Sequence, residues 1–401
     1  MTSSAASSTS LESPESQQLA QTDIQHTEGE QIDSVPTAVE EKTVEAKELS
    51  NEPLTFVNSP KIVLLFEDKM PVFHSDEPKP NDTTERPVLS LVVIVYDMPE
   101  QAKKTLYSFS AKYQIGVKES DYEVIVVENE SKNTLSKHDV EQFGSNFSYH
   151  LRAETEPTPV HAINFGASLA KGAMIGIAID GARMATPGLV SYVLAARRLS
   201  ANAIVAVPGY HLGRQIQQEA VQKGYNTVEE QKLLASIFWP QDGYRLFDIA
   251  VLSATSAGGY FKPAGESNCF CMSRELWEKV GGCDPRFNAT GGGQVNLDLY
   301  KRVVELPETI LIVLPGEGTF HQLHGGVTTA LVREKRKAVM DAHFTQYTEI
   351  RGEPYSPPKK RAIYLGAFPD NAMKLVQHSA MMVRRNRGDI SYKPAELFGI
   401  E

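Results

Sequence analysis

The sequence predicts an α/β fold in which a mostly parallel sheet carries helices on both faces. Short runs of apolar, often β-branched residues alternate with segments of helical spacing, which is the pattern of βα units. Acidic residues follow directly after three of these runs, at the sheet edge where such folds bind ligands. The chain has 401 residues, of which 41% are apolar, and this is enough for one large core or two smaller domains.

Five apolar runs predict the strands of this sheet. The first, 89–96, is almost continuously apolar, which indicates a strand buried on both faces. Further strands are expected at 122–127, 174–179, 203–207 and 309–314. Apolar residues at helical spacing predict helices between these strands, at 99–114, 161–173 and 187–199.

The beginning of the chain has a different composition. Residues 1–60 are rich in Ser, Thr, Gln and Glu and contain no aromatic residue before Phe56. Such a segment buries too little apolar surface to offset its chain entropy, so we expect a disordered acidic tail. Residues 61–86 are expected to be a linker, in which the apolar run 61–66 either adds an edge strand or stays disordered.

The remaining chain divides into a predicted main domain at 87–328 and a helical extension at 329–401. Helical spacing continues after the main domain to about residue 352, followed by a link rich in Pro and Lys. A last helix is expected around 373–385.

Charge and composition exclude several classes of protein. Residues 1–60 hold eleven acidic and two basic residues, so most of the net charge of −10 belongs to the tail. No dense block of Lys and Arg occurs, and we expect no nucleic-acid partner. Neither a signal peptide nor a run of eighteen apolar residues is visible, so we expect no transmembrane span and a cytoplasmic location.

The cysteines and the missing motifs narrow the function further. Three cysteines form no disulfide framework and no standard zinc spacing, so we expect buried packing residues in a reducing compartment. The chain lacks G-x-G-x-x-G after its first strand, G-x-x-x-x-G-K-[ST] and G-x-S-x-G. These absences argue against a dinucleotide-binding dehydrogenase, a P-loop NTPase and the commonest serine hydrolases.

Five segments follow one another in an informative order. They are SLVVIVY at 90–96, EVIVVENES at 123–131, NFGASLAKG at 164–172, IDGA at 179–182 and RELWEKVGGCDPRF at 274–287. Together they resemble the motifs of family 2 glycosyltransferases, over roughly residues 88–325. The resemblance implies the GT-A-type fold of nucleotide-diphospho-sugar transferases. It also implies transfer of a sugar from a nucleotide-diphosphate donor to a saccharide or other acceptor, with inversion, in glycan or polysaccharide synthesis.

The resemblance assigns donor contacts to the acidic residues that follow the strands. Glu128 stands where the family has the acid that contacts base and ribose, and Asp97 lies beside it. Asp180 takes the first position of the D-x-D motif, at the end of a buried strand where a charge is costly unless it is exposed or paired. Arg183 could neutralise a phosphate or pair with a nearby acid. The structural alternative for Asp97 and Glu128 is a cap or turn after the strand.

The metal site departs from the family pattern. Gly181 and Ala182 replace the later acids of D-x-D, so the usual metal-binding carboxylate is missing. A late histidine pair, His321 and His324, could complete a site for Mn²⁺ or Mg²⁺ together with Asp180. The alternatives are a ligand from elsewhere, a weak site or metal-free catalysis.

The acid pair that supplies the general base in the family is also missing here. The family's E-D-x-D-L motif aligns with 295–299, where Val295 and Asn296 replace the acid pair. Asn296 cannot accept the proton of an acceptor hydroxyl, so Asp298 and Glu266 remain as catalytic candidates. The structural role open to Asp298 is that of an acid in the first turn of a helix.

These departures keep a second function open. A non-catalytic protein that binds sugar nucleotides, or a scaffold on the same core, would tolerate the loss of both acid positions. A nucleotidyltransferase is a third alternative, but its usual glycine-rich loop after the first strand is absent.

We predict that the acidic tail is dispensable for folding. Deletion of residues 1–55 removes no core-forming pattern, so the thermal unfolding midpoint should stay unchanged. Differential scanning calorimetry of the full and shortened chains tests this. A fall of more than a few degrees would mean that the tail docks on the folded part.

Overall fold

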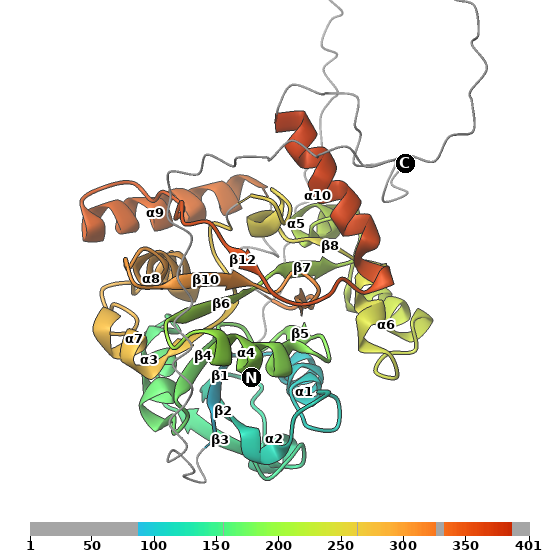
Figure 1. Ribbon diagram of the computed structural model, residues 1–401, viewed down its shortest axis with the longest axis horizontal. Coiled ribbons are helices and arrows are strands. Elements are labelled where there is room, and N and C mark those ends of the chain that lie inside the picture. The colour runs from blue at the N-terminus through green and yellow to red at the C-terminus, as the bar shows by residue number, and fades with distance from the viewer. Residues whose placement is uncertain (1–86, 155, 263, 326–332, 387–401) are drawn as a thin grey trace, which may run out of the picture. The chain divides into compact units, whose positions relative to one another are not determined.

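Two sheets organise the part of the chain that the computed structural model describes, residues 87–154, 156–262, 264–325 and 333–386 (Figure 1). The larger sheet has eight strands, in the order β12 (Ile363–Tyr364), β10 (Ile310–Val313), β6 (Ala203–Val207), β9 (Cys269–Ser273), β4 (Met174–Ala178), β1 (Leu89–Val95), β2 (Tyr122–Asn129) and β3 (Phe147–Arg152). The smaller sheet has the order β5 (Arg183–Ala185), β11 (Thr319–His321), β7 (Gly209–Leu212) and β8 (Ala250–Leu252).

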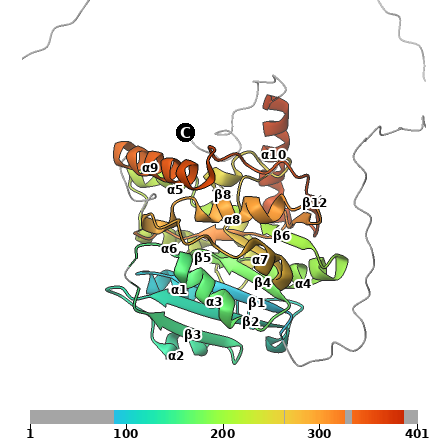
Figure 2. The same ribbon diagram turned by 90° about the vertical axis from the view of Figure 1, so that its left-hand side faces the viewer.

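The prediction of a mostly parallel sheet with helices on both faces is confirmed. Within the larger sheet only β9 runs antiparallel, against β4 and β6. One face is covered by α1 (Pro99–Ser108), α2 (Lys137–Glu141) and α4 (Leu189–Leu199). The other face is covered by α3 (Val160–Leu169), α7 (Arg274–Val280), α8 (Val295–Val304) and α9 (Arg333–Arg351) (Figure 2).

Strand β1 shows why the sequence pattern was informative. All seven of its residues are buried. Leu91 and Val93 pack into the core under α1 and α4, and Val92 and Ile94 pack into the core under α3. Because successive side chains point to opposite faces, a strand covered on both faces must be apolar throughout.

Helix α3 approaches the sheet closely at a glycine. A Cβ atom at Gly166 would lie 2.4 Å from Cγ1 of Val92 and 3.1 Å from Cγ2 of Val127. The motif at 164–172 therefore has a packing role here, because any larger side chain would push the helix off the strands.

The smaller sheet has its own apolar core. Tyr210 of β7 and Phe320 of β11 stack with ring centroids 4.9 Å apart. Helices α6 (Thr227–Ser236) and α10 (Met373–Asn386) contribute Leu234 and Leu375 to this core, and the short α5 (Gln217–Ala220) lies beside it. None of the described helices is both long and apolar enough to cross a membrane.

The structure describes the C-terminal part of the chain but not the N-terminal part. The expected tail 1–60 and linker 61–86 lie outside the described residues. From residue 333 the chain forms the two expected helices, α9 and α10, and also β12, which pairs in parallel with β10. All three cysteines are buried and free, as expected.

Asp298 joins α8 to α9. Its side chain is 1% exposed, and its two oxygens accept hydrogen bonds from Arg302 and Arg351, at 2.8 Å in each case for Oδ2. Arg351 also contacts the carboxylate of Asp284 at 3.0 Å. This buried network fixes α9 against the rest of the fold.

We predict that Arg351→Met lowers the free energy of unfolding by about 2 kcal/mol, because it leaves the buried Asp298 with one cation in place of two. Urea unfolding followed by circular dichroism measures the effect. Arg286→Met is the matched control, since Arg286 is largely exposed beside the same Asp284 and should leave the midpoint unchanged. Equal effects of the two substitutions would contradict the network.

Candidate functional site

Asp180, His321 and His324 come together where the two sheets meet. Asp180 follows β4, and His321 ends β11, which pairs antiparallel with β5 so that His321 lies opposite Arg183. Asp180 Oδ2 lies 3.0 Å from Nε2 of His321 and 3.6 Å from Nε2 of His324. The two imidazole nitrogens are 3.2 Å apart. The three side chains predicted from the sequence as metal ligands therefore lie next to one another.

The amide of Gln217 sets the tautomer of His321. Its Nε2 donates to the backbone carbonyl of His321 at 2.9 Å, which directs its Oε1 toward His321 Nδ1. His321 Nδ1 must then carry the proton, and Nε2 presents its lone pair to Asp180. Two acceptors that face each other in this way need a positive charge beside them.

The ionisation of the three groups follows from burial and from each other. Burial lowers the pKa of His321 to about 4, although the negative charge of Asp180 acts in the opposite direction. Burial also lowers the pKa of His324, but the Asp180 carboxylate outweighs it and raises that pKa above its ordinary value. Burial raises the pKa of Asp180, yet His324 and His321 together hold it well below its usual range. The positive charge is therefore supplied by a proton on His324 or by a metal cation.

The donor set suits a divalent metal ion. One carboxylate oxygen and two imidazole nitrogens lie within 4.8 Å of one another. His321 Nε2 offers a free lone pair, and Asp180 is ionised. Oxygen and imidazole ligands together favour Mn²⁺ over Mg²⁺, which prefers oxygen alone. Ala182 is fully buried and donates its backbone N–H to Asp180 Oδ1 at 2.9 Å.

Arg183 lies beside this cluster with unused donors. The residue is 8% exposed, and its Nε and one terminal nitrogen, Nη1, have no hydrogen-bond partner. Its Nε is 3.7 Å from Asp180 Oδ2, too long for a hydrogen bond. A buried guanidinium with free donors is well placed to bind an anion.

Three polar residues behind His321 were not found from the sequence. Gln217 is fully buried, Glu230 accepts hydrogen bonds from Leu323 N and the Tyr225 hydroxyl, and the ring of His211 lies 5.5 Å from that of His321. Burial raises the pKa of Glu230 to about 7. No motif marks these positions, because they come from α5, α6 and β7 and meet only through the packing of the smaller sheet.

Asp97 and Glu128 lie at the ends of β1 and β2, where the sequence placed them. Glu128 is fully buried, and its Oε2 accepts hydrogen bonds from Leu135 N at 2.9 Å and the Tyr149 hydroxyl at 2.8 Å. Its Oε1 has no partner, and burial raises its pKa. Asp97 is exposed and accepts hydrogen bonds from the backbone and side chain of Asn133. Both carboxylates hold the loop after β2.

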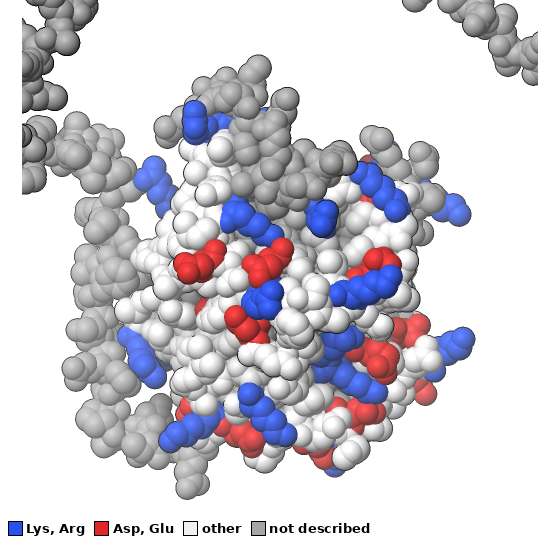
Figure 3. Space-filling model, turned by 90° about the vertical axis from the view of Figure 1, so that its right-hand side faces the viewer, with Lys and Arg blue, Asp and Glu red and all other residues white. Residues whose placement is uncertain are grey.

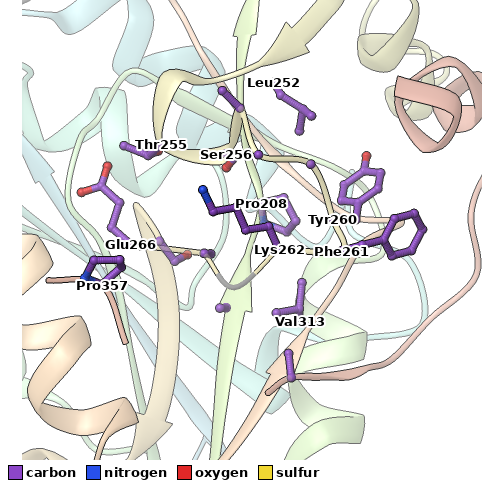
Figure 4. Close-up of a pocket in the computed structure, with 18 of the residues that line it drawn as sticks. Pro208, Leu252, Thr255, Ser256, Tyr260, Phe261, Lys262, Glu266, Val313 and Pro357 are labelled. Carbon is purple, nitrogen blue, oxygen red and sulfur yellow. The ribbon is translucent and has the colours of Figure 1, made fainter. Parts of the chain in front are cut away.

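Glu266 lies on the wall of a pocket of about 830 Å³ (Figure 4). It precedes β9, whose antiparallel direction brings this residue to the same sheet edge as Asp180. The amide of Asn296 donates to Glu266 at 3.3 Å and to the carbonyl of Ser267 at 3.1 Å. Burial raises the pKa of Glu266, although Arg183 and Asn296 act in the opposite direction. Asn296 thus serves to orient a carboxylate.

The two catalytic candidates therefore lie in different surroundings. Asp298 is enclosed between Arg302 and Arg351, and an acceptor hydroxyl cannot reach a carboxylate that is fully buried and doubly paired. Glu266 is partly exposed and faces open space.

Surface charge gives no sign of a broad charged face on the side of the molecule toward α10 and α6. On this side Lys and Arg are interspersed with Asp and Glu (Figure 3).

Comparison with known proteins finds likeness only among solved structures. No family model matches the chain, and no curated protein matches it. The mannosyltransferase PcManGT from Pyrobaculum calidifontis, in complex with GDP-Man and Mn²⁺, is 14% identical with a TM-score of 0.41, covering 78% of this chain and 79% of that one. S. aureus TarS in complex with UDP-GlcNAc is 12% identical with a TM-score of 0.39, covering 75% and 73%.

We predict that the double substitution His321→Ala with His324→Ala removes Mn²⁺ binding measured in the presence of UDP or GDP. Two of the three protein ligands are lost, and the remaining carboxylate with diphosphate oxygens holds the ion weakly. Electron paramagnetic resonance of free Mn²⁺ gives the bound fraction. His138→Ala, on an exposed histidine, is the control. Unchanged Mn²⁺ binding in the double variant would exclude the two histidines as ligands.

Proposed function

We propose that this protein transfers a sugar from a nucleotide-diphosphate donor to a hydroxyl-bearing acceptor. The observation that carries the proposal is the buried guanidinium of Arg183, with free donors, beside the Asp180–His321–His324 cluster. A cation with unused hydrogen bonds next to a metal-binding set has the chemistry needed for a diphosphate group.

The donor site would be built at the edge where β1, β2 and β4 end. Arg183 would bind a phosphate oxygen, and Asp180, His321 and His324 would hold the metal ion. A bound Mn²⁺ or Mg²⁺ supplies charge neutralisation to the diphosphate as it leaves. Asp97 and Glu128 remain the predicted contacts for the ribose and the base.

Glu266 is the group that would activate the acceptor. Its raised pKa makes it a better proton acceptor than an ordinary carboxylate, and Asn296 holds it in place. In the proposed reaction Glu266 takes the proton of the acceptor hydroxyl. The acceptor oxygen bonds to the anomeric carbon as the bond from that carbon to the diphosphate oxygen breaks, and the nucleoside diphosphate leaves with the bonding electrons.

A non-catalytic sugar-nucleotide-binding protein is the second candidate. It is favoured by Val295 and Asn296 in place of the acid pair, and by the enclosure of Asp298. Incubation with a panel of nucleotide sugars, with and without Mn²⁺, separates the two. Release of nucleoside diphosphate supports the enzyme, whereas binding without release supports the binding protein.

We predict that Asp180→Ala abolishes binding of UDP or GDP and that Arg183→Met weakens it by roughly 10- to 100-fold, the effect of losing one or two charged hydrogen bonds. Isothermal titration calorimetry measures both affinities in the presence of Mn²⁺. The matched control is Arg245→Met, because Arg245 is a partly exposed arginine paired with Asp248 at the surface. Thermal melts verify that each variant is folded. Nucleotide affinity that is unchanged in both variants would remove this cluster from the donor site.

A further inference from the structure

The pocket beside Glu266 has two walls that the proposed donor site does not use. One wall is the loop before β9, residues 254–262 and 264–267, and the other is the segment 355–364 that leads to β12. Lys262 lies between Glu266 on one side of the pocket and Tyr260 and Phe261 on the other in the view of Figure 4.

The two walls run side by side and are tied at both ends. At the end near Glu266, the hydroxyl of Tyr355 donates to the carbonyl of Gly265. At the other end, the hydroxyl of Tyr364 donates to the carbonyl of Tyr260 at 2.7 Å. Hydrogen bonds at both ends keep the pocket open without a ligand.

The charge of the lining is unbalanced. Lys262, Lys359 and Arg361 line the pocket, and Glu266 is the only acidic residue among the described lining residues. Within the described part of the chain, neither Lys262 nor Lys359 takes part in an ion pair, so their charges are not neutralised by a nearby acid. These cations therefore raise the affinity of the pocket for an anion.

Two aromatic rings are exposed at the rim. Phe261 is 48% exposed and Tyr364 is 47% exposed, with ring centroids 6.5 Å apart. The rings meet edge to face, with their planes at 75°, and their exposed parts offer an apolar surface on which a sugar ring can pack.

We propose that this pocket binds the acceptor and that the acceptor is an anionic saccharide, one that carries a phosphate or a carboxylate group. The inference rests on the proposed function, because it gives Glu266 the acceptor hydroxyl. The aromatic pair holds the sugar ring, Lys262 and Lys359 hold the anionic group, and Glu266 faces the hydroxyl that is to react.

Three probes test this on the full chain: glucose, glucose 6-phosphate and glucuronic acid. Ligand-observed NMR gives their affinities, and the two charged probes distinguish a phosphate from a carboxylate. We expect at least one charged probe to bind about tenfold more tightly than glucose. The double substitution Lys262→Met with Lys359→Met should remove that preference. Lys232→Met, on a lysine paired with Glu229 away from the pocket, should keep it.

The outcomes separate this inference from the proposed function. Equal binding of charged and uncharged probes, or no binding of the charged probes at millimolar concentration, would overturn the anionic acceptor. Displacement of a charged probe by UDP would also overturn it, because the pocket would then belong to the donor. UDP and GDP affinities measured on the same lysine variants should be unchanged. If the unsubstituted chain binds neither UDP nor GDP but still binds a charged probe more tightly than glucose, the proposed function alone is refuted.

Discussion

The largely buried carboxylate of Asp180 needs compensating groups around it, and this need constrains how the two sheets meet. Asp180 lies where β4 of the larger sheet meets β5 and β11 of the smaller, with a side chain that is 17% exposed. Such a charge is tolerated only beside donors and positive groups, here Ala182 N, His324 and Arg183. Because β11 must pair with β5 in the register that sets His321 opposite Arg183, a slip of one residue would leave Asp180 uncompensated.

The same constraint explains why position 182 carries no carboxylate. Ala182 is fully buried, and a carboxylate in its place would add a second negative charge beside Asp180 without further compensation. The imidazoles of His321, at the end of β11, and of His324 lie beside Asp180, and Gln217 fixes the first with its lone pair toward the cluster. The number of buried negative charges stays low, and Nε and Nη1 of Arg183 are left without a hydrogen-bond partner.

The sequence predicted those parts of the fold in which one-dimensional periodicity is strong. Strands β1, β2, β4 and β6 were found because burial on both faces requires a continuous apolar run. The strands β5, β8 and β11 have three residues each, too few for any periodicity to show, and β9 reads Cys-Phe-Cys-Met-Ser, with no β-branched residue. Strands β5, β9 and β11 nevertheless border the site, and β9 reverses direction to bring Glu266 to the edge where β4 ends.

By itself the sequence determined the α/β class, the positions of the acids after three strands, and Asp180, His321 and His324 as a candidate set. Whether these residues meet, and which of the two candidate carboxylates faces open space, was decided only by tertiary structure. From the sequence alone, Asp298 and Glu266 are both candidates for the general base. Packing of α9 encloses the first between two arginines, while the reversed strand β9 exposes the second to a pocket. Charge compensation and solvent access depend on groups distant along the chain, and a local pattern of residues contains no information about them.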